Sequence, residues 1–160
     1  MKRSICLILA VLLTVSVFSF SVSAGDSPEM VLVSESVQPL SDGSYILTAV
    51  YEEAVRARAA SYSKNGSKQS TYYNASGNAL WKFTVEGIFT VNPGVSSVCT
   101  SATYSYDIYN TNWIYNRATS YYTGNQAIGE AEFIRKLLGI TVERETCTLT
   151  LTCDKNGNLS

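Results

Sequence analysis

The feature that most constrains the fold is a regular alternation of apolar and polar side chains between Leu80 and Val91. The apolar residues on one face are Trp81, Phe83, Val85, Phe89 and Val91, and the polar residues between them are Lys82, Thr84, Glu86 and Thr90. Successive side chains of a β-strand point to opposite faces of a sheet, so this period of two predicts a strand with one buried face. Gly87 interrupts the apolar face and indicates a bulge or a close packing contact.

Residues 140–153 alternate in the same way. Cys147, Leu149, Leu151 and Cys153 fall on one face, and threonines occupy the positions between them. Runs of β-branched and aromatic residues predict further strands over 45–51, 63–74, 95–106, 113–122 and 126–135, separated by turn signals such as Asn92-Pro93-Gly94. We therefore expect an all-β domain. An antiparallel β-sandwich with immunoglobulin-like packing is the first guess, and a small β-barrel is the alternative.

Two segments give weaker signals. Residues 25–44 mix two prolines with acidic residues and serines, which predicts a loosely ordered N-terminal segment in which Met30 to Val33 form at most an added edge strand. The β domain proper is expected over residues 45–160. Residues 52–60 consist of good helix formers without an apolar stripe, so we expect either a short helix or a linker there.

The N-terminus predicts export. Two basic residues, Lys2 and Arg3, precede an apolar run from Ile5 to Phe18, and small residues end the segment at Ala24. This is the pattern of a cleavable signal peptide over residues 1–24, whereas a membrane span needs about 20 apolar residues. We expect a secreted product without a membrane anchor, and a retained anchor is the alternative. Removing Lys2 and Arg3 leaves 10 basic against 13 acidic residues, a balance that argues against nucleic acid or an anionic membrane surface as a partner.

Cysteine usage indicates one disulfide bond and excludes the usual metal and cofactor sites. Three cysteines follow the signal peptide, and the oxidising compartment that export implies allows two of them to pair. We expect a bridge between Cys99 and Cys153 that pins the last strand, and Cys99 with Cys147 is the rival pair. The sequence holds no histidine and no C-x-x-C motif, so we expect no zinc site, no other metal and no cofactor.

Paired carboxylates are the one catalytic motif that the sequence offers. Glu130 with Glu132, and Glu143 with Glu145, would each share a strand face. Glycosidases use two carboxyl groups in this way, but charges on exposed strands also keep sheet edges from pairing, and the second explanation is favoured. The Asp154–Asn158 segment lacks the ligand pattern of a calcium loop and predicts a turn.

Aromatic residues are the more informative feature for function. The candidate contact residues are Tyr104, Tyr106, Trp113, Tyr115 and Tyr121, which two neighbouring strands could bring into one surface. Rings beside Asn and Ser donors suit sugar or peptide recognition, whereas packing at sheet margins is the structural explanation. We therefore expect a secreted non-catalytic domain that binds an extracellular glycan, peptide or cell-wall component. The alternatives are a small secreted hydrolase using the paired glutamates, and a purely structural or assembling secreted domain.

The chain from about Ser61 onward also carries a resemblance. Its KNGSK, ASGNALWKFTVEGIFTVNPG, VCT, NTNW and LTCDKNGNLS stretches resemble a group of small secreted proteins of Gram-positive gut bacteria that has no assigned activity. The pattern of that group includes cysteines that match Cys99 and Cys153 and a tryptophan that matches Trp81, while Cys147 is an addition. The resemblance implies export and a shared domain, and it implies no mechanism.

Overall fold

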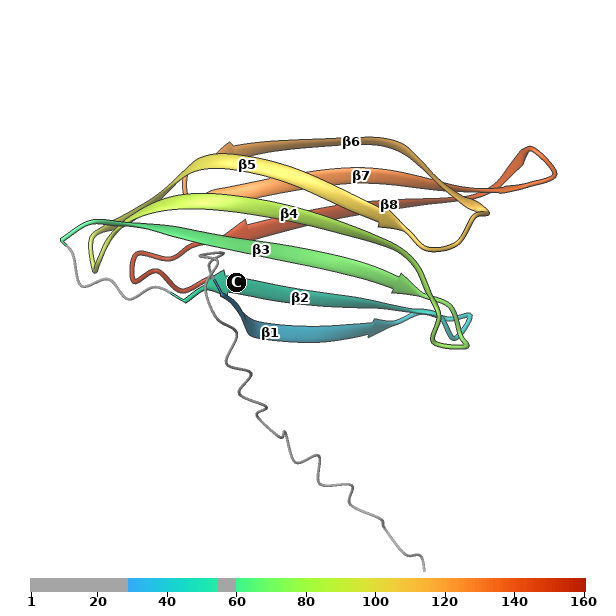
Figure 1. The fold of residues 1–160 in the computed structure, drawn as a ribbon, viewed down its shortest axis with the longest axis horizontal. Helices are drawn as coiled ribbons and strands as arrows, with labels where there is room; N and C mark the ends of the chain where they lie inside the picture. Colours follow the sequence, from blue (N-terminus) through green and yellow to red (C-terminus); the bar gives the residue numbers. More distant parts are fainter. Residues whose placement is uncertain (1–28, 55–59) are drawn as a thin grey trace, which may run out of the picture.

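The computed structural model describes residues 29–54 and 60–160, which form eight β-strands (Figure 1). The strands are β1 (Met30–Pro39), β2 (Tyr45–Glu53), β3 (Tyr62–Tyr73), β4 (Ala79–Asn92), β5 (Ser96–Ile108), β6 (Trp113–Thr123), β7 (Gln126–Leu137) and β8 (Ile140–Thr152). Within these two ranges no helix is long and apolar enough to cross a membrane.

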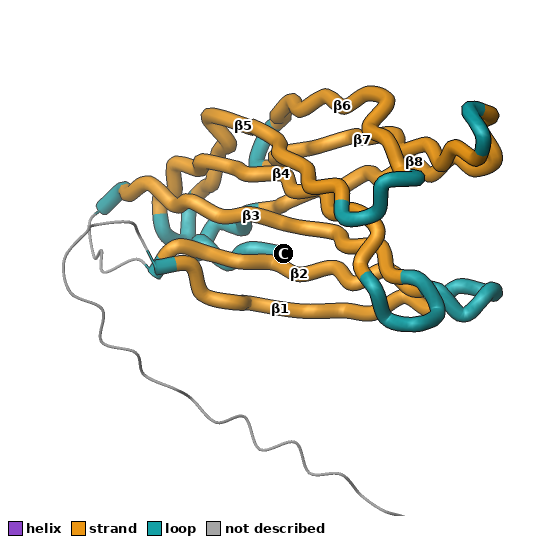
Figure 2. Tube along the Cα trace, turned by 45° about the vertical axis from the view of Figure 1, so that its right-hand side comes forward, coloured by secondary structure: helices purple, strands orange, loops and turns teal. Residues whose placement is uncertain are grey.

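The strands form two antiparallel sheets, as predicted. Strands β1 to β5 make the larger sheet and β6 to β8 the smaller one, and neither sheet closes on itself. Strand β7 packs on β4 and β5, and β8 packs on β3 and β4, which makes a β-sandwich (Figure 2). Every hydrogen-bonded neighbour is also a neighbour in sequence, so each sheet is a meander rather than the Greek key of immunoglobulin domains.

The predicted apolar faces form the core. All five apolar residues of the β4 face are almost fully buried, and so is the predicted inner face of β8. The ring of Trp81 stacks on Phe133 of the opposite sheet at a centroid distance of 4.3 Å. Gly87 lies beside a register shift between Ile88 and Phe89, so the bulge that its position indicated is present.

Two weaker predictions need correction. The segment predicted as loosely ordered contains a ten-residue strand, β1, which pairs with β2 from Met30 to Pro39 with one register shift between Leu32 and Ser34. The short helix or linker expected over residues 52–60 is wrong for its first residues, because Glu52 and Glu53 end β2. Residues 1–28 and 55–59 lie outside the described part of the chain. They include the predicted signal peptide and most of the segment predicted as a short helix or linker.

The turns that follow the odd-numbered strands lie together at one end of the sandwich. In an up-and-down meander alternate turns lie at the same end, and Figure 1 shows the β1–β2, β3–β4, β5–β6 and β7–β8 connections together on its right-hand side. Short polar side chains shape three of these turns. The Asp42 carboxylate accepts a hydrogen bond from Ser44 N at 3.0 Å, Asn74 Oδ1 accepts one from Asn78 N at 2.9 Å, and Asn110 Oδ1 accepts one from Asn112 N at 2.9 Å.

Candidate functional site

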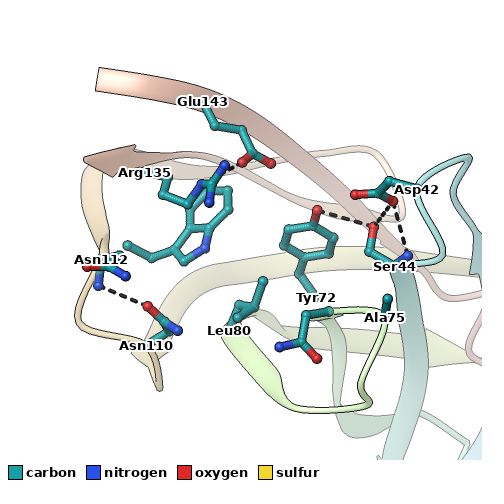
Figure 3. Close-up of a pocket in the computed structure, with 11 residues that line it drawn as sticks. Asp42, Ser44, Tyr72, Ala75, Leu80, Asn110, Asn112, Arg135 and Glu143 are labelled. Carbon is teal, nitrogen blue, oxygen red and sulfur yellow. Dashed lines mark hydrogen bonds and ion pairs between the residues drawn. The ribbon is translucent and has the colours of Figure 1, made fainter. Parts of the chain in front are cut away.

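A pocket of about 240 Å³ opens at this end of the sandwich, and we call it the end pocket (Figure 3). Its walls are Asp42, Ser44, Tyr72, Asn74, Ala75, Leu80, Asn110, Asn112, Trp113, Arg135 and Glu143. These residues come from the turns described above, from the end of β3, from the starts of β4 and β6, and from the β7–β8 hairpin. Ligand pockets of drug-sized molecules enclose roughly 300–1,000 Å³, so the end pocket suits a smaller ligand.

Apolar and aromatic side chains line the inner part of the end pocket. The rings of Tyr72 and Trp113 meet edge to face at 5.6 Å, and both residues are almost completely buried against Leu80 and the core. The Tyr72 hydroxyl lies 3.3 Å from Ser44 Oγ, which holds the phenol in place. Burial raises the pKa of Tyr72, and nearby carboxylates including Glu143 and Asp42 raise it further, so the phenol stays a neutral donor.

The outer part of the end pocket is polar. Three carboxamides surround it, from Asn74, Asn110 and Asn112. Backbone amides occupy the Asn74 and Asn110 oxygens, but none of the three amide nitrogens donates to a partner within residues 29–54 and 60–160. A carboxamide offers both donors and acceptors, so this rim can bind hydroxyl groups in either direction.

Charged groups complete the rim. Arg135 Nε donates to Glu143 Oε2 at 2.7 Å, so this pair closes one side of the pocket and leaves the other Glu143 oxygen open to a ligand. The Asp42 carboxylate, whose pKa is lowered by hydrogen bonds from Ser44, stays ionised on the opposite side. The end pocket therefore presents an apolar aromatic wall, amide donors and acceptors, and two carboxylates.

The predicted aromatic surface is divided among three places. Tyr104, Tyr106 and Tyr115 lie together beside the β5–β6 margin, where the Tyr106 and Tyr115 rings stack at 4.3 Å with an interplanar angle of 1°. Trp113 is only 3% exposed and reaches the end pocket instead of an open surface. Tyr121 donates from its hydroxyl to Glu130 Oε1 at 3.0 Å, away from that stack. The single five-residue surface is therefore a wrong prediction, because Trp113 packs with the core.

The margin cluster of Tyr104, Tyr106 and Tyr115 is part of the packing between the sheets. Tyr106 contacts the ring of Phe133 on the opposite sheet edge to face, and Tyr104 lies 6.0 Å from the ring of Phe83 on the neighbouring strand of its own sheet. Both tyrosines keep about two fifths of their surface exposed, at 37% and 41%. Their inner halves support the fold, which leaves a narrow aromatic strip rather than an open platform.

The carboxylate pairs do not have the properties of an acid and base. Glu130 and Glu132 border a hollow of about 520 Å³ on the smaller sheet, but Glu132 binds Arg144 and Asn116 and its pKa is lowered by both. A carboxyl group held ionised in this way is a poor proton donor. Glu143 faces the end pocket, whereas Glu145 borders a separate pocket between β2 and β8, and burial raises its pKa.

The other predicted sites have a plain structural role. Asp154 accepts hydrogen bonds from Asn156 N and Asn158 N, each at 2.8 Å, so this segment is the predicted turn. In the described ranges no group of three Cys, Asp or Glu side chains is placed to hold a metal ion. Cys99, Cys147 and Cys153 are buried free thiols in this structure, so the predicted Cys99–Cys153 bridge is not formed in it.

The end pocket was not predicted from the sequence. Asp42, Asn74, Asn110 and Asn112 lie in alternate turns of the chain, and only the meander order places those turns at one end. The turns that contain Asp and Asn can be found in the sequence. Their meeting at one end can be predicted only once the strand order is known.

Comparison of the chain with protein-family models, with curated proteins and with solved structures found no match.

Proposed function

We propose that this protein is an exported, non-catalytic module that binds one sugar unit of an extracellular glycan in the end pocket. The observation that carries this proposal is the combination of a buried aromatic wall, Tyr72 and Trp113, with a rim of carboxamides and carboxylates in a pocket of about 240 Å³.

The chemistry of the pocket favours a sugar over a peptide or an apolar molecule. A sugar ring carries C–H groups on its faces and hydroxyl groups around its edge. The apolar ring face would lie on the aromatic wall, while the hydroxyl groups would exchange hydrogen bonds with Asn112, Asn74 and the free Glu143 oxygen. A small pocket with few polar groups at fixed positions is the usual form of a specific ligand site.

A binding role is also favoured by what the carboxylates do. Glycoside hydrolysis needs a proton donor of raised pKa close to a second carboxylate. Glu132 is tied to Arg144 and Asn116, which lower its pKa and keep it ionised, and Glu143 is paired with Arg135. Among residues 29–54 and 60–160, the carboxyl group with a raised pKa is that of Glu145, and it borders a different pocket from the one that Glu143 lines.

Export follows from the sequence of residues 1–24, and the disulfide bond would follow from export. Cys99 N donates to Gly124 O at 2.8 Å and Cys153 N donates to Asn125 O at 3.0 Å, so the two cysteines flank consecutive carbonyls of one turn. Cys147 borders the pocket between β2 and β8 instead. This arrangement favours Cys99–Cys153 over Cys99–Cys147, and the exporting cell would supply the oxidant that accepts two electrons from the thiols.

The test is a binding titration with monosaccharides and cell-wall glycan fragments by calorimetry. The pocket variant is Asn112→Ala, because no hydrogen bond of the Asn112 side chain supports the described fold. Loss of one hydrogen bond to a ligand weakens binding by about twofold to tenfold. The matched control is Asn78→Ala on the neighbouring β3–β4 turn, a residue outside the pocket wall, and it should bind as the unaltered protein does.

Two outcomes would contradict the proposal. One is the absence of binding by the unaltered protein to every sugar tested. The other is binding that Asn112→Ala leaves intact and that Tyr104→Ala with Tyr106→Ala abolishes, which would transfer the function to the margin cluster.

A further inference from the structure

The β7–β8 hairpin ends in an apolar tip that projects beyond the other turns at its end of the sandwich (Figure 1). We define this apolar tip as Leu137, Leu138, Gly139 and Ile140. Its three large side chains are 59%, 95% and 69% exposed, in the order of the chain. These side chains contribute little to the stability of the fold, because an apolar side chain stabilises a protein by being buried.

The backbone conformation at Leu138 is also unusual for a leucine. Its φ is +51°, and Gly139 follows with a φ of +81°, so both central residues of this turn are in the left-handed region. Such a two-residue hairpin turn favours Asn-Gly, and a left-handed conformation costs other residues about 1–2 kcal/mol. A strained and almost fully exposed leucine therefore points to a role outside the fold.

Charges are arranged behind the apolar tip. The sequence after residue 24 has more acidic than basic residues, but the hairpin tip differs from it: residues 136–142 contain Lys136 and no acidic residue. Arg135, Arg144 and Glu143 follow along the two strands. At about 3.3 Å per residue, Arg135 lies roughly 10 Å from Leu138 along the strand. Arg135 is paired with Glu143 and Arg144 with Glu132. Apolar groups that enter a membrane interface reach about 5–10 Å deep, so Lys136, beside the tip, would lie at the level of the lipid headgroups.

We propose that the apolar tip inserts into the surface of a lipid bilayer, with Lys136 against anionic headgroups. A lipid surface fits this feature better than a protein partner, because a stable protein interface takes roughly 20–30 residues a side and the tip offers four. Arg135 and Glu143 belong both to the base of the hairpin and to the rim of the end pocket. Insertion of the tip would therefore hold the end pocket close to the membrane surface.

The experiment measures sedimentation of the protein with vesicles of phosphatidylcholine alone and of phosphatidylcholine mixed with phosphatidylglycerol. The material is collected from the medium of a secreting bacterial host, and its mass is checked first, because a retained apolar segment at residues 5–18 would itself bind lipid. The test variant is Leu138→Asn. The control is Val95→Asn, since Val95 is 79% exposed at a turn between β4 and β5, away from the hairpin tip.

Leu138→Asn should lower the partition coefficient by at least about tenfold, while Val95→Asn should leave it unchanged. Lys136→Gln should weaken binding about fivefold, on the vesicles with phosphatidylglycerol only. Asparagine tolerates the left-handed region, so Leu138→Asn should keep or raise the melting temperature, which separates lost binding from lost folding.

The proposal is overturned if the unaltered protein does not sediment with either vesicle, or if Leu138→Asn sediments equally well. It is also overturned if light scattering shows self-association that Leu138→Asn abolishes, because the tip would then contact a second copy. None of these outcomes depends on sugar binding in the end pocket.

Discussion

Replacing Gly87 with alanine tests how closely the two sheets pack. A Cβ atom at this position would lie 2.7 Å and 2.8 Å from two ring atoms of Phe89, and 2.9 Å from the Cβ of Ala127 on the opposite sheet. Both neighbours are fully buried, so neither can move into solvent. Adding a methyl group to a filled core costs typically about 1–3 kcal/mol.

The net effect of Gly87→Ala is smaller than this cost, because alanine also restricts the unfolded chain. That second effect stabilises a protein by about 0.4–1 kcal/mol. The expected result is therefore a loss of about 1–2 kcal/mol in the free energy of unfolding, measured by urea denaturation followed by tryptophan fluorescence. With a slope of about 2 kcal/mol per molar urea, the middle of the usual range, the midpoint should fall by roughly half to one molar.

Gly129→Ala provides the matched comparison. Its added Cβ would lie 3.0 Å from Val85 Cβ and 3.1 Å from two atoms of the Phe83 ring, which is tight but less so than at Gly87. Gly129→Ala should therefore destabilise the protein less than Gly87→Ala does. An unchanged or raised midpoint for Gly87→Ala, at an unchanged slope, would refute this account of the packing between the sheets.

Three further outcomes are expected. Glu132→Gln should destabilise the protein at neutral pH, because Arg144 loses its partner. Since the folded state lowers the pKa of Glu132 from 4.5, its contribution to stability is present above pH 4.5 and is lost as the pH falls through the folded value, so urea midpoints of the two proteins should converge in acid. Cys147, whose pKa burial raises to about 11, should stay unlabelled by a thiol reagent at pH 8 until urea unfolds the chain, and fast labelling of the native protein would contradict its burial. Tyr72→Phe removes the hydrogen bond to Ser44 and should lower the free energy of unfolding by about 0.5–1.5 kcal/mol, as judged by thermal melts; an unchanged melting temperature would show that this bond adds nothing to stability.

The strands could be predicted from the sequence because most of them have one buried face. The alternation in β4 and β8 identified their core residues correctly. Strand β1 was largely missed for the opposite reason. All ten of its residues are exposed, so no buried face imposes a regular alternation of apolar and polar residues on its sequence.

The candidate site could be predicted only in part, because exposure of an aromatic residue depends on the strand order. Tyr106 and Trp113 were predicted to share one exposed surface, yet the first is 41% exposed at a sheet margin and the second is buried beside Tyr72. The end pocket depends on which turns share an end of the sandwich. That information comes from the topology, since Asp42 and Asn112 are 70 residues apart in the chain.

The central claim, that a sugar binds in the end pocket, is tested most directly by following side-chain signals in nitrogen–proton NMR spectra during a glycan titration. The chain has two tryptophans, and Trp113 lines the end pocket whereas Trp81 does not. We expect the Trp113 indole signal and the Asn112 carboxamide signals to shift with one common binding curve while the Trp81 indole signal stays in place. Shifts confined to residues around Tyr104 and Tyr106, or no shift with any glycan fragment, would contradict the claim.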